Sequence, residues 1–340
     1  MKSTHINRDK KEEHNRHFAK DALLGVAVGD ALGVPVEFVV REDLEIFPVK
    51  GMRGYGTHHQ PPGTWSDDSS LTFCLAESVI AGFSLKDLAQ RMVQWYEEGY
   101  WTAHGEVFDI GNATRSAIKR LSSAQMLPAQ AGGKSHHDNG NGSLMRILPL
   151  VFQFADETPE ERYRLVGQVS GLTHGHFRSI FSCFIYLEIA RLLLQGGTPQ
   201  EAYQGGIAQA QQIADARKLP EKELRLFERV LDGRLPQLQR FQIHSSGYVL
   251  HSLEASLWSW LTTESYEEAV LTAINLGADT DTNGAITGGL AGLTYGHAAI
   301  PMDWITHLQR KGDIVDLADR LHAKLHQAQN GGAQQGGMVA

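Results

Sequence analysis

Apolar residues recur at helical spacing along most of this chain. Each stripe repeats every three or four residues, which places its members on one face of a helix. The clearest stripes cover residues 71–79, 180–193, 250–261 and 269–274. The period-two alternation of a half-buried strand is absent, apart from one short candidate at Glu37-Phe-Val-Val. The pattern predicts a compact all-α domain of many medium-length helices.

Breaks in the helical pattern mark loops and ends rather than a domain boundary. Glycine- and proline-rich loops are expected at 48–63, 128–142, 196–198 and 232–236. Residues 1–18 are polar and charged and predict a flexible arm, whereas the glycine- and glutamine-rich residues 327–340 predict a disordered tail. Residues 19–326 are then expected to form a single domain, which is long enough for a substantial core.

Composition narrows the class of protein. The 340 residues carry a formal net charge of −8, which argues against a nucleic-acid partner because such a partner favours a basic face. Cys74 and Cys183 both lie in apolar helical stretches, and free buried thiols in a reducing cytoplasm are the expectation. Residues 282–302 are uncharged, but their glycines favour a close-packed internal helix, so no membrane is implied.

Two acidic clusters stand at predicted helix beginnings. One joins Asp279 and Asp281 to the hydroxyl of Thr282, and the other is the run Ser66-Asp67-Asp68, with Ser66 as a candidate N-cap. Each cluster alone could simply complement a helix dipole, an effect of about 0.3–1 kcal/mol per charge.

Taken together, the two clusters favour a metal centre. Four carboxylates that converge beside apolar surface would repel one another unless cations hold them. Carboxylate and hydroxyl oxygens suit Mg²⁺ or Mn²⁺, whereas zinc is disfavoured because no His/Cys cluster has ligand spacing. The histidine pairs His58-His59 and His136-His137 are expected at the surface or in supporting positions.

Other polar residues sit among small ones. Small residues share one face of the segment 25–33, and Asp30 within it must be paired or support a metal; Glu37 follows a proline turn and could face a cleft. The glycine-rich run at 139–143 precedes an expected apolar helix, where backbone N–H groups could cradle a phosphate, although a plain loop is the alternative. Asp109 with Gly111, and Thr173-His-Gly-His, also precede expected helices and suggest a cleft.

These segments, taken in order, resemble the ADP-ribosylglycohydrolase family. The resemblance spans roughly residues 20–300. The matching pieces are Gly29-Asp-Ala-Leu-Gly with Glu37, Trp65-Ser-Asp-Asp-Ser, Gly111-Asn-Ala-Thr-Arg, Gly140-Asn-Gly-Ser-Leu-Met-Arg, Thr173-His-Gly-His and Gly277-Ala-Asp-Thr-Asp-Thr. The family more often has threonine where Ser66 stands, which retains a hydroxyl oxygen, and a small residue where Thr280 stands.

The resemblance implies an orthogonal multi-helix bundle with a binuclear Mg²⁺ or Mn²⁺ centre at the base of a cleft. The implied metal ligands are Ser66, Asp67, Asp68, Asp279, Asp281 and Thr282. The implied catalytic carboxylates are Asp109, Glu37 and Asp279. The expected substrate-binding residues are Asn139, Gly140, Asn141, Gly142, Ser143, His174, Gly111 and Tyr248.

Such an enzyme removes ADP-ribose from a modified protein. The segments around Phe108 and Ser246 are closer to the arginine-directed bacterial branch, which predicts cleavage of ADP-ribosylarginine. Two alternatives stay open. The chain could be an immunity protein that blocks an ADP-ribosyltransferase toxin, with residues 1–18 contacting the transferase, or a glycohydrolase of small ADP-ribosyl or ribosyl metabolites.

Overall fold

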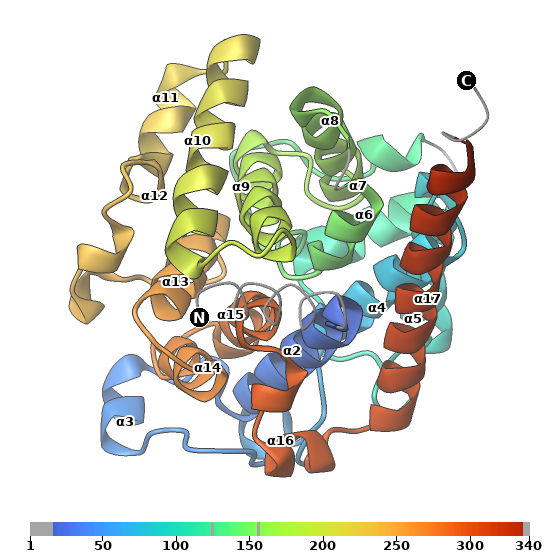
Figure 1. Cartoon of the computed structure of the whole chain (residues 1–340). Helices are drawn as coiled ribbons and strands as arrows, with labels where there is room; N and C mark the ends of the chain where they lie inside the picture. The colour runs from blue at the N-terminus through green and yellow to red at the C-terminus, as the bar shows by residue number, and fades with distance from the viewer. Residues whose placement is uncertain (1–15, 124–125, 155–156, 336–340) are drawn as a thin grey trace, which may run out of the picture.

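The computed structural model describes residues 16–123, 126–154 and 157–335, and all regular structure in these ranges is helical (Figure 1). The α-helices are α2 (Phe18–Gly33), α3 (Arg41–Ile46), α4 (Asp67–Ile80), α5 (Leu85–Glu98), α6 (Asn112–Ser122), α7 (Val151–Phe154), α8 (Pro159–Ser170), α9 (Phe177–Leu194), α10 (Pro199–Arg217), α11 (Glu221–Leu224), α12 (Glu228–Leu231), α13 (Val249–Leu261), α14 (Tyr266–Ile274), α15 (Thr280–Tyr295), α16 (Met302–His307) and α17 (Lys311–Gln335). Short 3₁₀ turns are η1 (Val34–Val36), η2 (Gly56–His58), η3 (Pro128–Gln130), η4 (Leu148–Leu150), η5 (Arg225–Phe227), η6 (Leu235–Gln237), η7 (Arg240–Gln242) and η8 (His297–Ala299). The predicted all-α fold is confirmed.

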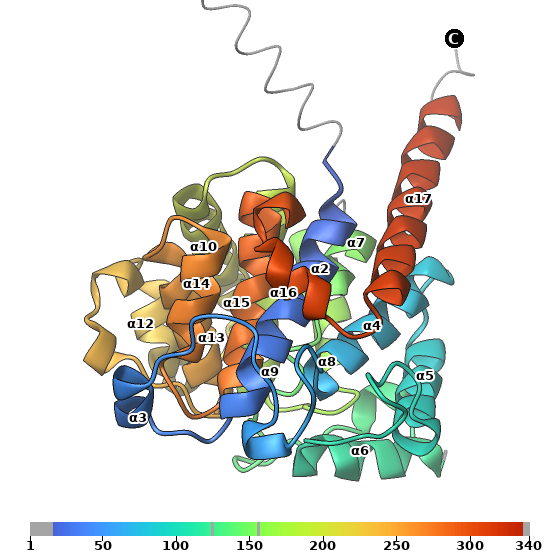
Figure 2. The same cartoon turned by 90° about the horizontal axis from the view of Figure 1, so that it is seen from below.

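The core is organised around α2 and α15, which lie side by side in both views (Figures 1 and 2). Their backbones touch through glycines. A Cβ added to Gly29 would lie 2.1 Å from the carbonyl oxygen of Gly284, and one added to Gly25 would lie 2.2 Å from that of Gly288. No side chain fits in either gap, so the small residues of segment 25–33 serve the close contact that the sequence predicts. The contact places Asp30 of α2 beside the first turn of α15.

Other helices cover this central pair. α13 and α14 pack on α15, and α4 and α17 pack on α2. α9 contacts α13 and α15 on one side and α10 on the other (Figure 1). The four apolar stripes predicted from the sequence fall within α4, α9, α13 and α14. Cys74 and Cys183 are free and buried, as expected. None of the described helices combines the length and apolar character that a membrane crossing requires.

The local structure departs from the sequence pattern in two places. Residues 37–40 form no strand, because Phe38 has a φ of 64° and pairs with Ala278 instead. The glycine-rich run at 139–143 leads into turns and η4, and Pro149 in that turn disfavours a regular helix. α17 continues to Gln335, and the disordered tail expected at 327–340 stays a prediction.

The predicted arm ends differently too. α2 begins at Phe18, with His17 as its N-cap, so the last residues of the segment 1–18 belong to the folded part. Residues 1–15 and 336–340 lie outside the described residues. The division into arm, domain and tail otherwise stays a prediction.

Candidate active site

Two helix beginnings that are far apart in the chain meet, as the sequence predicts. Ser66 is the N-cap of α4 and accepts a hydrogen bond from the N–H of Asp68 at 3.3 Å. Asp279 is the N-cap of α15, with Asp281 and Thr282 in its first turn. The hydroxyls of Ser66 and Thr282 both donate to Oδ2 of Asp68, at 2.8 Å and 3.4 Å. The bond from Thr282 joins the two acidic clusters directly.

The carboxylates form two adjoining groups that share one residue. One oxygen from each of Asp30, Asp68 and Asp281 lies within 4.8 Å of the others, and a second group of the same spacing joins Glu37, Asp279 and Asp281. Oδ1 of Asp68 and Oδ2 of Asp281 are buried and have no hydrogen-bond partner among the described residues. Orphaned carboxylate oxygens in a buried cluster fit hard divalent cations, which satisfy both the oxygens and the charge. Asp281 stands between the two groups.

The protonation of these acids reflects their surroundings. Burial, followed by the negative charge of neighbouring carboxylates, raises the pKa of Asp67, Asp68 and Asp281 well above the usual range. Burial likewise raises the pKa of Asp279. Asp67 lines the adjacent cavity but belongs to neither group, so a ligand role for Asp67 stays a prediction.

Asp30 belongs to the first carboxylate group and also forms hydrogen bonds with the start of α4. Its carboxylate accepts hydrogen bonds from the N–H of Ser66 and from the N–H and hydroxyl of Ser69, at 2.6–3.1 Å. Burial raises the pKa of Asp30 to about 6. Asp30 thus fastens the first turn of α4 to α2, and it lies within reach of a cation bound by Asp68 and Asp281.

Glu37 and Asp109 face each other across His58. Nε2 of His58 bonds the carboxylate of Glu37 and lies 3.9 Å from that of Asp109. The hydroxyl of Thr57 donates to the Glu37 carbonyl oxygen at 2.6 Å, so η2 holds both the backbone and the side chain of Glu37. Burial and nearby charge, from Asp279 and from Glu37 respectively, raise the pKa of Glu37 to about 8 and of Asp109 to about 7. Both carboxyls therefore hold a proton more tightly than a solvent-exposed acid does.

A cavity of about 430 Å³ lies over the carboxylates. The predicted site residues that line it are Glu37, Asp67, Asp109, Gly111, Gly140, Asn141, Gly142, His174, Asp279 and Thr282. Ser66, Asp68 and Asp281 lie buried beneath them. Backbone strain surrounds the cavity: Phe38, Asp109 and Ala278 all have positive φ, between 53° and 64°. Such strain costs on the order of 1–3 kcal/mol per residue and is typical of functional sites.

His174 reaches the cavity as a neutral hydrogen-bond donor. Arg146, which is buried, donates to the hydroxyl of Thr173 at 2.8 Å, and that hydroxyl lies 2.8 Å from Nδ1 of His174. Burial lowers the pKa of His174 to about 3. With the Thr173 hydroxyl donating to Nδ1, the imidazole proton is assigned to Nε2, near Gly140 and Gly142.

The substrate contacts expected of Asn139, Asn141, Ser143 and Tyr248 stay predictions, and each of these side chains has a partner within the fold. Asn139, Ser143 and Tyr248 do not line the cavity. The Ser143 hydroxyl is buried against Ser170, and the Tyr248 hydroxyl accepts from Arg178.

The side chains of Asn139 and Asn141 also have hydrogen-bond partners within the fold. The amide of Asn139 donates to the carbonyl oxygen of His136. Asn141 lines the cavity, but its amide donates to Oδ2 of Asp279 at 2.7 Å and to Ser252 at 2.8 Å. Asn141 therefore orients a carboxylate, and its substrate contact stays a prediction.

Sequence reasoning missed some of the site. His58 takes the supporting position that the sequence analysis allowed, but its contacts with Glu37 and Asp109 were not foreseen. Asn112, Thr114, His137 and Met145 also line the cavity. For His58 the only signal is its place in a loop rich in glycine and proline, whereas Asn112 and Thr114 adjoin the Gly111 motif.

The pH dependence of stability provides a test of the cluster. The raised pKa values of Asp30, Asp109 and Glu37 mean that each binds its proton more tightly in the folded chain than in the unfolded one. The free energy of unfolding of the metal-free protein is therefore expected to fall as pH rises from about 4 to about 8.

A divalent cation should reverse this trend, because it takes the place of the protons. At a thousandfold excess over its Kd, Mn²⁺ is expected to add about 4 kcal/mol and raise Tm by roughly 5–10 °C at pH 8, and much less at pH 5. Thermal unfolding of EDTA-dialysed protein with and without MnCl₂ measures both effects. A Tm gain that is equal at both pH values would place the cation outside this cluster.

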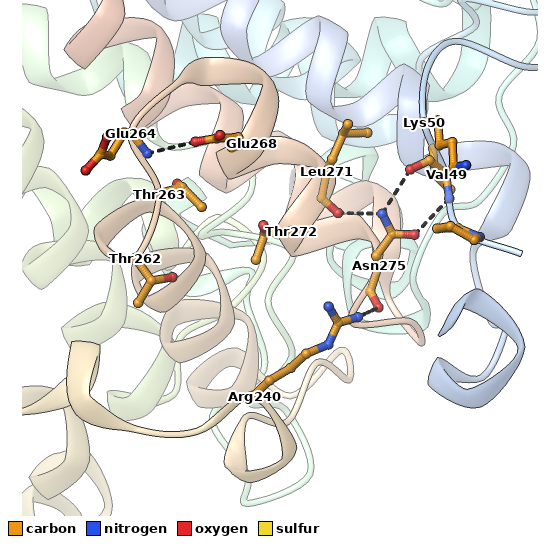
Figure 3. Close-up of a pocket in the computed structure, with 11 residues that line it drawn as sticks. Val49, Lys50, Arg240, Thr262, Thr263, Glu264, Glu268, Leu271, Thr272 and Asn275 are labelled. Atoms are coloured by element: carbon orange, nitrogen blue, oxygen red, sulfur yellow. Dashed lines mark hydrogen bonds between the residues drawn. The ribbon is translucent and has the colours of Figure 1, made fainter. Parts of the chain in front are cut away.

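A second groove, of about 630 Å³, lies between α14 and the loop that contains Val49 (Figure 3). Two of its polar side chains, Asn275 and Arg240, make hydrogen bonds within the fold. The side chain of Asn275 bonds the backbone of Val49 and Leu271, and Arg240 donates to the carbonyl oxygen of Asn275. None of the predicted site residues lines this groove, so the chemistry is assigned to the cavity over the carboxylates.

Comparison with known proteins agrees with the geometry. Residues 11–331 match the family model described as ADP-ribosylglycohydrolase. The chain is 33% identical over 305 residues to ADP-ribosylarginine hydrolase Tri1 of Serratia proteamaculans, covering 89% of this chain and 78% of that protein. It is 28% identical to the ADP-ribosyl-[dinitrogen reductase] glycohydrolase of Rhodospirillum rubrum, over 88% of this chain and 92% of that protein. A solved structure titled ADP-ribosylglycohydrolase-related protein complex superposes with a TM-score of 0.75 at 34% identity, covering 93% of this chain and 99% of that chain.

Proposed function

The chain belongs to the ADP-ribosylglycohydrolase family, and from this premise we propose that it hydrolyses the N-glycosidic bond between ADP-ribose and an arginine side chain of a modified protein. The observation that carries the proposal is the similarity, over most of the chain, to proteins named ADP-ribosylarginine hydrolases. The alternatives of a transferase-blocking protein and of an enzyme for small metabolites are not favoured by these relatives.

Two divalent cations, Mg²⁺ or Mn²⁺, are proposed as cofactors. Asp68, Asp281 and Thr282 would hold them together with Asp279, and Asp30 and Ser66 would support them from below. When bound, such cations supply Lewis-acid chemistry: they orient ribose hydroxyls and make a bound water more acidic. Asn141 fixes Asp279 through its amide, which keeps that carboxylate aimed at the same point.

Acidic side chains of the cavity are proposed to transfer the proton that the leaving group needs. Hydrolysis forms a bond between a water oxygen and the anomeric carbon and breaks the bond from that carbon to the guanidino nitrogen, which leaves with the electron pair. One water proton must end on that nitrogen. Asp109 and Glu37 are proposed for this transfer, because both line the cavity on either side of His58 and burial raises the pKa of both. Asp109 is our first choice for the residue that faces the leaving group.

Substrate binding is proposed along the other wall of the cavity. His174 would donate from Nε2 to a diphosphate oxygen, and backbone N–H groups of Gly140 and Gly142, which also line the cavity, would donate to the same diphosphate. A Cβ on Gly142 would lie 2.7 Å from the His174 ring, so glycine is required there. The neutral imidazole gives a hydrogen bond without a fixed charge.

Turnover of defined substrates tests the proposed function. The protein is expected to release ADP-ribose from arginine-ADP-ribosylated substrates, and EDTA should reduce the rate by at least about 10²-fold. Serine-ADP-ribosylated substrates should remain intact. Release from the serine substrate alone would overturn the linkage, and release that survives EDTA would remove the metal requirement.

Two further proposals concern the cellular compartment of the protein and a partner protein. The free thiols of Cys74 and Cys183 suit a reducing compartment, and we propose the cytoplasm. A contact between residues 1–18 and an ADP-ribosyltransferase is proposed as an additional role; residues 1–15 of this segment lie outside the described residues.

A further inference from the structure

We propose that an exposed apolar rim beside the catalytic cavity binds apolar side chains that flank the modified arginine of the substrate polypeptide. The apolar rim consists of Phe38, Val40 and Phe241, whose side chains are 66%, 55% and 80% exposed. All three line one groove of about 540 Å³. This inference rests on the proposed function and adds a preference among its substrates.

The groove adjoins the catalytic cavity. Phe38 lines both, directly after Glu37 in the chain. Ala278 lines the groove and directly precedes Asp279. When the ADP-ribose occupies the cavity, the polypeptide that carries the modified arginine extends out of the cavity opening, next to the apolar rim. The polypeptide on at least one side of that arginine therefore passes over the groove.

The rim is rigid, which a free loop of exposed aromatic residues would not be. The N–H of Phe38 donates to the carbonyl oxygen of Ala278 at 2.6 Å, and the N–H of Ala278 donates to that of Val39 at 2.9 Å. Gly277 makes this approach possible, since a Cβ there would lie 2.8 Å from the Val39 carbonyl oxygen. Phe38 and Ala278 are both held at positive φ by these bonds.

Arg41 fastens the other side of the rim. Its guanidinium donates to the backbone carbonyl oxygens of Arg240 at 2.9 Å, Ile243 at 2.5 Å and Leu276 at 2.9 Å. These bonds hold the segment that carries Phe241 against the segment that carries Val40. A preorganised aromatic surface loses little conformational entropy on binding, which is how a small contact gains affinity.

Large exposed apolar side chains that gather at one place mark binding surfaces more often than isolated ones do. The groove also contains Arg41, Glu42, His244 and His251, so both signs of charge are present and no strong charge preference is expected. The occupant that fits is a short peptide segment with apolar side chains next to the modified arginine.

Kinetics with three substrates distinguish binding at the apolar rim from the hydrolysis step. They are free ADP-ribosylarginine, a peptide with ADP-ribosylarginine between leucine and phenylalanine residues, and the same peptide with serine and glycine flanks. The unsubstituted protein is expected to show a KM about tenfold lower for the apolar-flanked peptide than for the polar-flanked one, with a similar kcat.

Rim variants should remove that difference. Phe241→Ser and Val40→Ser are expected to raise KM for the apolar-flanked peptide to the value of the polar-flanked one, while turnover of free ADP-ribosylarginine is unchanged. Met302→Ser on α16 is the matched control, because Met302 is 73% exposed and lines neither the groove nor the cavity. It should behave like the unsubstituted protein with all three substrates.

The outcomes that contradict the docking surface are distinct from failure of the proposed function. Equal KM values for the two peptides, or a Phe241→Ser defect of the same size with free ADP-ribosylarginine, would overturn the apolar rim and leave the hydrolase intact. No release from any of the three substrates would overturn the hydrolase itself and the rim with it. A dimer in sedimentation that Phe241→Ser dissolves would assign the rim to self-association instead.

Discussion

Replacing Asp281 with asparagine is expected to lower kcat/KM for ADP-ribose release by about 10³-fold or more, equivalent to roughly 4 kcal/mol of transition-state stabilisation. Asp281 is fully buried and belongs to both carboxylate groups at the head of α15. Asparagine keeps the size of the side chain and removes its charge. Both proposed cation positions would therefore lose a shared ligand, and metal content measured on the purified variant should fall below two per chain.

Measuring Tm with and without metal distinguishes an aspartate that binds a cation from one that only stabilises the fold. Because the carboxylates around Asp281 repel it, Asp281→Asn should raise the Tm of the metal-free protein while it lowers the gain from added Mn²⁺. Asp21→Asn is the matched control. Asp21 is also buried on α2, but it bonds Arg16 and His297 at the opposite end of the helix pair. That variant should lower Tm with and without metal and keep two cations. An Asp281→Asn protein with full activity and two cations would refute the assigned role.

Substituting Gly29 with alanine is expected to destabilise the protein by about 3 kcal/mol or more. The new methyl group would lie 2.1 Å from the carbonyl oxygen of Gly284, so α2 and α15 must move apart along their contact. The same movement separates Asp30 from Asp281, and the affinity for Mn²⁺ should fall together with stability. Urea unfolding and a Mn²⁺ titration measure the two effects.

Gly312→Ala is the matched control for this substitution. Gly312 lies near the start of α17, and a Cβ there meets no atom within 4 Å. Alanine should leave stability unchanged or raise it by about 0.5–1 kcal/mol, since it favours the helix. A Gly29→Ala protein as stable as the Gly312→Ala protein would show that the backbones of α2 and α15 can part without cost.

The sequence predicts the helices and the acidic cluster well because the signals for both are local. The stripe from Leu71 to Val79 repeats within one helix, and Ser66 caps α4 through its own neighbours. The convergence of the two acidic clusters could be inferred because isolated buried charges are so costly. The comparisons support the family and the arginine-directed activity.

What the sequence could not predict depends on partners far along the chain. The backbone of Phe38 is set by Ala278, which no local pattern reveals. Asn141 stands in a loop that suits a phosphate, yet its amide is used by Asp279, 138 residues away. His58 is drawn into the site by Glu37, and an adjacent pair of histidines in a loop gives no sign of that contact.

The glycine contact between α2 and α15 divides the protein into parts that can evolve at different rates. Two helices whose backbones touch cannot tilt or slide, so the floor of the cavity tolerates very little change in sequence. The segments around Phe38 and Phe241 are held by the backbone pair of Phe38 with Ala278 and by the guanidinium of Arg41, so the exposed side chains of Phe38 and Phe241 can change without loss of these bonds. Target preference can therefore drift among descendants of this chain, or be redesigned, while the chemistry beneath stays constant.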